Sequence, residues 1–210
     1  MPRAVFFDFG GVISSSPLEA FREYERRHAI PEGFIVRVNS TNPDDNAWAR
    51  IERSELTLEQ FDEAFAIESE ALGHRIPGHE MIALLRGSIR PEMIRALDVL
   101  RQHSFVLACL TNNVVNLGTS AEHEAAFSKF DFVVESSRVN VRKPERRFYE
   151  IACETAGVTP DECVFLDDLG INLKPAREMG MTTIKVTSAE QALGELVATL
   201  ELPALFESAL

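Results

Sequence analysis

Five short apolar runs, rich in valine, isoleucine and phenylalanine, constrain the fold of this chain more than any other feature of its sequence. Uninterrupted apolar runs of this length are typical of strands that are buried on both faces of a parallel sheet. Helical patterns separate the later runs, and this alternation predicts an α/β fold with helices on both faces of the sheet. The five predicted strands are Ala4–Asp8, Phe105–Leu110, Phe132–Val134, Cys163–Asp167 and Thr182–Val186.

The helical patterns between the later strands begin with clear signals. Arg90-Pro91 opens a pattern that extends to about His103, and Lys143-Pro144 opens another that ends near Gly157. Proline is favoured in the first turn of a helix, because the N–H group that it lacks has no partner there. Thr159–Glu162 and Ser188–Gln191 are capping boxes, in which a hydroxyl is followed by a carboxylate or amide at the third helical position. We therefore expect helical turns to begin at these residues.

One interval, residues 14–90, breaks this alternation. Within it Phe34–Val38 has the pattern of a short strand, and the other segments have helical patterns with a capping box at Thr57–Gln60. The acidic stretch Glu52–Glu70 is interpreted as a solvated helix face. We predict a helical cap domain at residues 14–90, inserted into a core domain formed by residues 1–13 and 91–210. The predicted cap helices are Leu18–Ala29, Ala47–Arg53, Leu58–Leu72 and His79–Leu85.

Charge and composition exclude several classes of partner. The chain has 33 acidic and 21 basic residues, whereas nucleic acids and anionic membranes are bound by clustered Lys and Arg. No apolar stretch approaches the roughly 18 residues of a membrane span, and the first residues lack the apolar region of a signal peptide, so we expect a cytoplasmic protein. The three cysteines lack zinc-site spacing, which indicates buried free thiols. Residues 201–210 are interpreted as a docking segment or a frayed tail.

Polar residues stand at the carboxyl ends of three predicted strands. Asp8 ends the first strand, Thr111 follows the second, and Asp167 and Asp168 close the fourth. Ligands of an open parallel sheet bind outside the carboxyl ends of the strands, where the strand order reverses. If the first strand lies between the second and the fourth, these side chains converge on one site.

The acidic residues of this group have both a chemical and a structural interpretation. Asp8 is followed by Gly10 and Gly11, which permit close approach to a substrate, although a turn aspartate would have the same neighbours. Asp167 and Asp168 repel each other at the end of a buried strand, so a cation should compensate them. Mg²⁺ shared with Asp8 would do so, because it prefers oxygen ligands. The alternative is that one aspartate caps the following helix.

The remaining polar residues also allow two interpretations. Thr111, Asn112 and Asn113 at a strand-to-helix turn form a cradle for phosphate or an ordinary helix cap. Lys143 precedes Pro144, which favours an extended conformation and lets the lysine project ahead of the next helix. The alternative for Lys143 is a solvated surface residue, the usual environment of lysine.

In order and spacing these residues resemble the four motifs of the haloacid dehalogenase superfamily. Phe165–Arg177 and Met181–Ile184 are most similar to the phosphatase-type domain at the N-terminus of soluble epoxide hydrolase, and to the related domain of a large acyl-CoA dehydrogenase family member. The resemblance implies a Rossmann-like sheet with strand order 5-4-1-2-3, a helical cap after the first strand, and a magnesium-dependent phosphomonoesterase of small organic phosphates. The four motifs are Val5–Val12, Leu110–Asn113, Arg142–Pro144 and Phe165–Asp168.

The resemblance also implies a role for each site residue. Asp8 would attack phosphorus in line and form an aspartyl-phosphate that water hydrolyses, while Lys143 neutralises charge and Asp167 orients this lysine. The other implied roles fall into three groups. The phosphoryl oxygens would be held by Thr111 with Asn112; Mg²⁺ would be held by Asp8, the carbonyl of Gly10 and Asp168; Gly11 would lie beside the substrate and Asn172 near the metal.

Gly10 departs from the pattern of the superfamily's phosphatases, which usually carry a second aspartate there as general acid and base. General acid–base catalysis contributes typically about 10²–10⁴-fold, so the departure implies a preference for good leaving groups such as acyl, anomeric or aryl phosphates. Two rival functions stay open. In a dehalogenase Asp8 would displace halide from carbon without a divalent ion, and a degenerate relative would bind a phosphorylated ligand without turnover.

Overall fold

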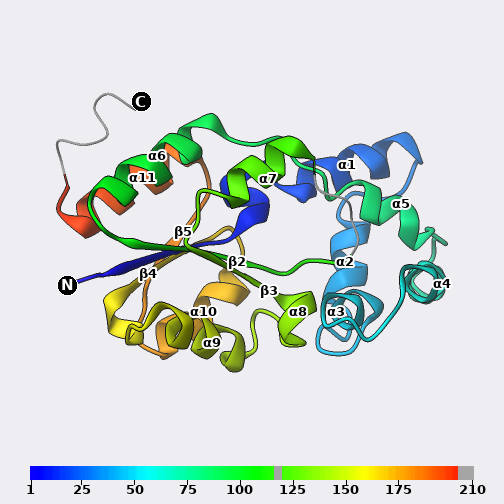
Figure 1. Cartoon of the computed structure of the whole chain (residues 1–210). Coiled ribbons are helices and arrows are strands. Elements are labelled where there is room, and N and C mark those ends of the chain that lie inside the picture. Colours follow the sequence, from blue (N-terminus) through cyan, green and yellow to red (C-terminus); the bar gives the residue numbers. More distant parts are fainter. Residues whose placement is uncertain (116–119, 203–210) are drawn as a thin grey trace.

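The computed structural model describes residues 1–115 and 120–202 (Figure 1). Five parallel strands form one sheet in the order β3-β2-β1-β4-β5. This is the predicted order, counted from the opposite edge, so β1 lies between β2 and β4 and the predicted α/β fold is confirmed. The strands are β1 (Ala4–Phe7), β2 (Val106–Thr111), β3 (Phe132–Glu135), β4 (Cys163–Asp167) and β5 (Thr182–Lys185).

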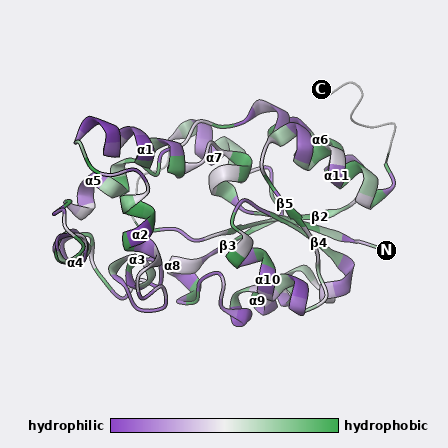
Figure 2. Cartoon of the chain, turned by 180° about the vertical axis from the view of Figure 1, so that it is seen from behind, coloured by the Kyte–Doolittle hydropathy of each residue, from purple (hydrophilic) through white to green (hydrophobic). Residues whose placement is uncertain are grey.

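Helices cover both faces of the sheet (Figure 1). Side chains alternate along β1, so Val5 and Phe7 join the hydrophobic cluster of one face, and Ala4 and Phe6 join that of the other. In Figure 2 the green of hydrophobic residues is concentrated on the strands and on the inner sides of these helices. One face carries α6 (Pro91–Gln102), α7 (Ala121–Phe127) and α11 (Ala189–Leu200); the other carries α8 (Ser136–Val139), α9 (Arg146–Ala156) and α10 (Gly170–Glu178).

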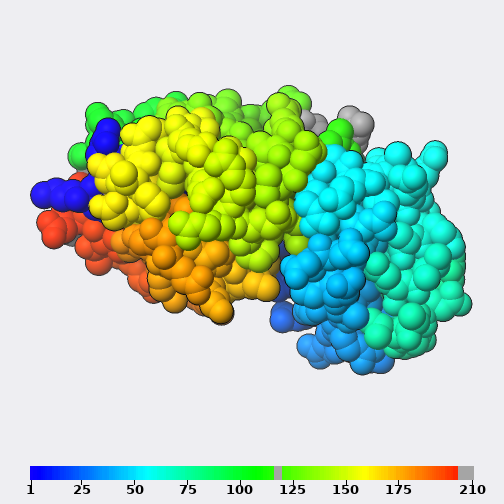
Figure 3. Space-filling model, turned by 90° about the horizontal axis from the view of Figure 1, so that it is seen from below, coloured from blue at the N-terminus to red at the C-terminus, as the bar shows by residue number. Residues whose placement is uncertain are grey.

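Five further helices lie beyond the carboxyl ends of the strands and pack around a third hydrophobic cluster (Figure 1). Val114, which follows β2, belongs to this cluster and connects it to the sheet. In Figure 3 these helices form one end of the molecule, against the yellow-green part of the chain. The division into cap and core domains stays a prediction. The helices are α1 (Pro17–Arg27), α2 (Phe34–Ser40), α3 (Ala47–Glu52), α4 (Leu58–Ala71) and α5 (Gly78–Ala83).

The chain leaves the sheet for these helices and returns to it at one place. Ser14 and Ile89 form an antiparallel bridge. Beside it, the N–H of Arg90 donates to the carbonyl of Ile13 at 2.9 Å, and the N–H of Ser15 donates to the carbonyl of Ser88 at 2.8 Å. We call the residues between Ser14 and Ile89, which contain α1 to α5, the helical segment; its two ends therefore lie side by side.

The predicted strand Phe34–Val38 is wrong, because this segment is helix α2. Ile35 is buried and its neighbour Val36 is 43% exposed, while Phe34 and Val38 are buried with Ile35, which is the spacing of a helical face. The carboxylate of Glu25 accepts hydrogen bonds from the N–H groups at the start of this helix. These donors have no partner within the helix, so Glu25 supplies what a seven-residue helix lacks.

The other sequence predictions for this region and the chain ends have mixed outcomes. The capping boxes at Thr57, Thr159 and Ser188 each have both reciprocal hydrogen bonds, although Thr159 starts a 3-10 turn of three residues. The three cysteines are buried and free, as predicted. None of the helices within residues 1–115 and 120–202 is long and apolar enough to span a membrane. Most of the C-terminal segment, residues 203–210, lies outside the described residues.

Candidate active site

The turn that follows β1 brings Asp8 next to the acidic pair. The N–H of Asp8 continues the ladder to β4 by donating to the carbonyl of Leu166 at 2.8 Å. Gly11 has a φ of +79°, and a Cβ there would lie 2.2 Å from Oδ2 of Asp168. Position 11 therefore requires glycine for its backbone conformation and for the carboxylate beside it. Gly10 is different, since a Cβ at this position would meet Pro17 Cδ at 3.9 Å, an ordinary contact.

The sheet brings three carboxylates together as the sequence predicted. Oxygens of Asp8, Asp167 and Asp168 all lie within 4.8 Å of one another. Thr111 ends the neighbouring strand β2 and is buried, in a register that pairs Phe7 with Cys109. Its position near Asp8 follows from parallel pairing, because carboxyl ends of adjacent parallel strands share one edge.

Lys143 lies between two of these carboxylates. Its Nζ is 2.8 Å from Oδ1 of Asp8 and 2.8 Å from Oδ2 of Asp167. The side chain is 1% exposed, so the interpretation as a surface lysine is wrong. The ring of Phe165 lies beneath the ammonium, with its centroid 5.6 Å from Nζ. A charge this deep in the molecule is stable because both carboxylates compensate it.

Asp167 and Asp168 have different surroundings. The oxygens of Asp167 accept hydrogen bonds from Lys143, from the N–H of Leu169 at 2.8 Å and from Asn172 at 3.1 Å. Asp167 therefore holds Lys143 and has little remaining capacity for a metal. The side chain of Asp168 is only partly buried and accepts a longer hydrogen bond, 3.3 Å from Oγ of Ser16, so its oxygens are better placed to bind a cation.

The charges in this cluster do not balance. Burial raises the pKa of Asp8 to about 8, because Lys143 offsets only part of the desolvation while Asp167 and Asp168 add repulsion. Burial and the neighbouring Asp167 raise the pKa of Asp168 to about 6. Burial lowers the pKa of Lys143, but the two carboxylates outweigh this and raise it above its ordinary value. Asp8 therefore needs a further positive charge to stay ionised at neutral pH, and a divalent cation with oxygen ligands fits.

Asn112 faces the main chain of Lys143. Its Oδ1 accepts the N–H of Lys143 at 2.8 Å, and its Nδ2 donates to the carbonyl of Lys143 at 3.0 Å. The same Nδ2 donates to Oε2 of Glu52 at 3.1 Å. The predicted contact of Asn112 with phosphoryl oxygens stays a prediction, since its side-chain amide is bonded to Lys143 and Glu52.

Two buried residues support the site from outside the carboxylate cluster. Asn172 donates to both oxygens of Asp167, and its carbonyl accepts the hydroxyl of Tyr149 at 2.6 Å. Glu52 is 7% exposed, so its assignment to a solvated helix face is wrong. Its partner Arg142 lies 90 positions away, and a separation of that size leaves no local pattern in the sequence.

The sequence as a whole has a recognisable relationship to known proteins. A family model for haloacid dehalogenase-like hydrolases matches residues 2–180. The chain belongs to this family. Solved structures at about 20% identity share the fold. One is a haloacid dehalogenase family enzyme from Bacteroides thetaiotaomicron in complex with magnesium and inorganic phosphate, with a TM-score of 0.62. The match covers 93% of this chain and 99% of that enzyme's chain. The L-2-haloacid dehalogenase from Xanthobacter autotrophicus, with chloropropionic acid covalently bound, has a TM-score of 0.62, 20% identity, and covers 100% of this chain and 86% of its own.

Three curated relatives in this family are similar over nearly all of the chain. Acyl-CoA dehydrogenase family member 10 of Mus musculus is 34% identical over 206 residues, which are 96% of this chain and 19% of the relative. Bifunctional epoxide hydrolase 2 of Mus musculus is 33% identical over 92% of this chain and 38% of the relative. The chain therefore spans well under half the length of both. Phosphatase MT3486 of Mycobacterium tuberculosis (strain CDC 1551 / Oshkosh) is 29% identical over 94% of this chain and 93% of its own length.

Proposed function

We propose that this chain is a magnesium-dependent phosphomonoesterase of small organic phosphates, with Asp8 as its covalent nucleophile. The observation that carries the proposal is the group of three carboxylates, buried at Asp8 and Asp167 and partly buried at Asp168, with Lys143 between Asp8 and Asp167. A group with this charge favours a divalent cation, which phosphoryl transfer uses and halide displacement from carbon does not require. The relative named as a phosphatase, which the chain matches over most of its length, supports the same choice.

The contacts of Asp8 suggest how the first step would proceed. Its Oδ1 accepts the N–H of Phe9 at 2.7 Å and pairs with Lys143 at 2.8 Å. Oδ2 would attack phosphorus, forming the bond to Asp8 as the bond to the leaving oxygen breaks. Lys143 stays protonated between the two carboxylates and would stabilise the charge that develops on the phosphoryl oxygens.

The remaining residues would bind the phosphoryl group and the cation. Thr111 and main-chain N–H groups of the turn after β2 would hold phosphoryl oxygens. Asp8, Asp168 and the carbonyl of Gly10 would hold Mg²⁺, which when bound neutralises negative charge on the phosphoryl group. In the second step water would attack phosphorus, release inorganic phosphate and regenerate the carboxylate of Asp8.

Gly10 would determine which substrates react fast. Without a side chain at position 10, the leaving oxygen takes its proton from solvent. Acyl, anomeric and aryl phosphates have leaving groups that need little protonation, so they would turn over faster than alkyl phosphates. The same feature favours a second candidate function, the binding of a phosphorylated ligand without turnover.

Hydrolysis of p-nitrophenyl phosphate and a panel of organic phosphates tests the proposal, with Mg²⁺ or with EDTA, in wild type and Asp8→Asn. Turnover that requires both Mg²⁺ and Asp8 is expected. A folded protein that binds Mg²⁺ and vanadate but hydrolyses none of the panel would favour the ligand-binding function. Halide release from 2-chloropropionate that is insensitive to EDTA would favour a dehalogenase.

A further inference from the structure

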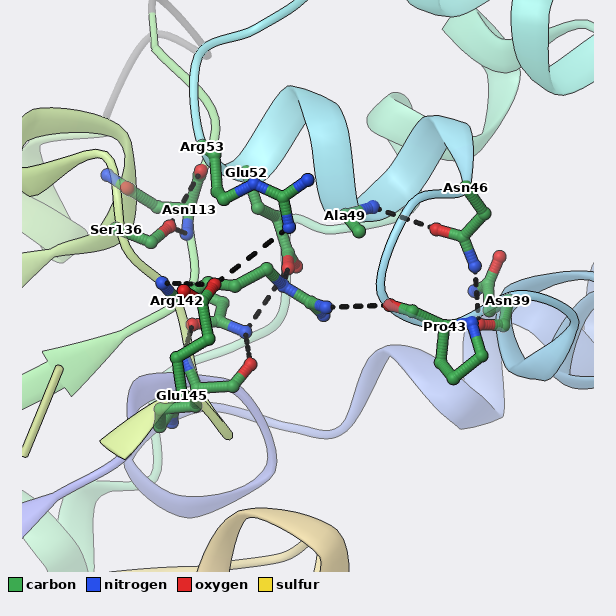
Figure 4. Close-up of polar contacts among 12 residues, drawn as sticks. Asn39, Pro43, Asn46, Ala49, Glu52, Arg53, Asn113, Ser136, Arg142 and Glu145 are labelled. Atoms are coloured by element: carbon green, nitrogen blue, oxygen red, sulfur yellow. Dashed lines mark hydrogen bonds and ion pairs between the residues drawn. The ribbon is translucent and has the colours of Figure 1, made fainter. Parts of the chain in front are cut away.

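A largely buried ion pair between Glu52 and Arg142 connects helix α3 to the residue that precedes Lys143 in the chain (Figure 4). Glu52 ends helix α3, and its Oε2 accepts the Nε of Arg142 at 2.5 Å and the Nδ2 of Asn112 at 3.1 Å. The side chains of Glu52 and Arg142 are 9% and 15% exposed. Two charges at this depth lose much of their hydration, so the pair is weak evidence for a role in stability alone.

Both partners of Glu52 lead directly to the main chain of Lys143. Arg142 precedes Lys143 in the chain. Asn112 accepts the N–H of Lys143 at 2.8 Å and donates to its carbonyl at 3.0 Å. Glu52 is therefore connected to the backbone of Lys143 through one intervening residue on each of two routes, Asn112 and Arg142. The Nζ of this lysine has to stay 2.8 Å from the carboxylates of Asp8 and Asp167 at once.

Two other contacts join the same two surfaces. Arg142 also donates from Nη1 to the carbonyl of Pro43 at 3.0 Å, as Figure 4 shows. The hydroxyl of Ser54 donates to the carbonyl of Ser137 at 2.8 Å. Ser54 lies two positions after Glu52 and bonds to the neighbouring helix α8, so it offers a matched control for the loss of a contact at this interface.

We propose that Glu52 is a positioning residue for Lys143. Through Asn112 and Arg142 it holds the lysine backbone so that Nζ keeps its place between the two carboxylates. The helical segment thus contributes to the placement of a group on the opposite side of the interface, and the lysine is held fully only while the two surfaces are in contact. The catalytic consequence of this placement rests on the phosphomonoesterase function proposed above.

Three variants test the proposal: Glu52→Ala, which removes the acceptor; Glu52→Gln, which keeps an acceptor oxygen of the same reach; and Ser54→Ala. In Glu52→Ala we expect exchange of the Lys143 amide hydrogen, followed by NMR, to quicken about tenfold. We expect kcat for p-nitrophenyl phosphate to fall about 10–100-fold with KM nearly unchanged, because misplacement by about 1 Å costs about 100-fold. Glu52→Gln should restore most of both values. Ser54→Ala should lower Tm and leave both unchanged.

Equal effects of Glu52→Ala and Ser54→Ala on the Lys143 amide and on kcat would overturn the proposal, as would an unchanged amide in Glu52→Ala. If Glu52→Ala fails to fold, Glu52→Gln carries the comparison, because the amide keeps an acceptor oxygen but loses the charge: exchange at Lys143 that is faster than in Ser54→Ala supports the proposal, and exchange equal to that in Ser54→Ala overturns it. The amide measurement needs no turnover. A wild-type protein without phosphatase activity would therefore refute the proposed function alone, while the exchange rates still decide the role of Glu52.

Discussion

Replacing Gly11 by alanine should disable the cation site by a defined geometric route. A Cβ at this position would lie 2.2 Å from Oδ2 and 2.4 Å from Cγ of Asp168, whereas ordinary contacts begin at 3.4 Å. The carboxylate of Asp168 would have to withdraw by about 1 Å, a displacement of the size that costs about 100-fold in a positioned site. The backbone adds a second cost, because φ is +79° and a left-handed conformation costs a non-glycine residue roughly 1–2 kcal/mol.

Both effects of Gly11→Ala can be measured separately. The backbone strain should lower Tm by about 2–8 °C, since 1 kcal/mol corresponds to about 2–4 °C in a chain of this size. Titration with Mg²⁺, followed by calorimetry, should show weaker binding, and turnover of p-nitrophenyl phosphate should fall about 100-fold. Gly170→Ala is the matched control, because a Cβ there would meet no atom of the described residues within 4 Å. Wild-type Mg²⁺ affinity and Tm in Gly11→Ala would refute this account of the turn.

Three further outcomes are expected. Gly10→Asp places a carboxylate where a Cβ has room. The value of kcat/KM for alkyl phosphates should rise, by at most about 10²–10⁴-fold, and the value for aryl phosphates should rise less. Equal gains for both classes of substrate would contradict the role assigned to Gly10. Lys143→Met leaves the carboxylates of Asp8 and Asp167 without their cation, and urea unfolding at pH 7 should show a loss of about 3–5 kcal/mol. The pKa values of Asp8 and Asp168 in the folded protein are raised to about 8 and about 6, so the EDTA-treated protein should lose stability as the pH rises from 4 to 8. Mg²⁺ binds the ionised forms and should therefore raise Tm more at pH 8 than at pH 6. An equal rise of Tm at both pH values would contradict the assignment of these two residues to the cation site.

The sheet and the acidic part of the site could be predicted because their signals are local. Asp8 and Asp167 each follow or end an apolar run, and the parallel register of β1 and β4 brings these two strand ends side by side. Lys143 gave no such signal, since lysine is usually exposed and its burial depends on a carboxylate 24 positions away in the chain. Pro144 indicated that the lysine projects ahead of a helix, and the family resemblance gave it a role in the site.

The errors at Phe34–Val38 and at Glu52 also have physical causes. A short apolar run such as Phe34–Val38 fits a strand or a helix equally well. Here Glu25 stabilises the helix, because its carboxylate accepts hydrogen bonds from the N–H groups of Gly33 and Ile35. Glu52 has the composition of a solvated helix face around it, yet the cation of Arg142 draws it into the interface. In both cases the structure depends on an ionic or hydrogen-bonding contact with a residue outside the local pattern, and the spacing of apolar residues contains no information about such contacts.

The bridge between Ser14 and Ile89 means that the chain departs from the sheet and rejoins it through adjoining residues. A loop whose ends already meet imposes little entropic cost when its length changes, because closure depends only weakly on the number of residues enclosed. Insertions or deletions between these residues would leave the strand order and the turn after β1 undisturbed. The helices between these residues can therefore change in length without moving Asp8, provided that the contacts of Ser16 with Asp168 and of Glu52 with Arg142 and Asn112 are kept.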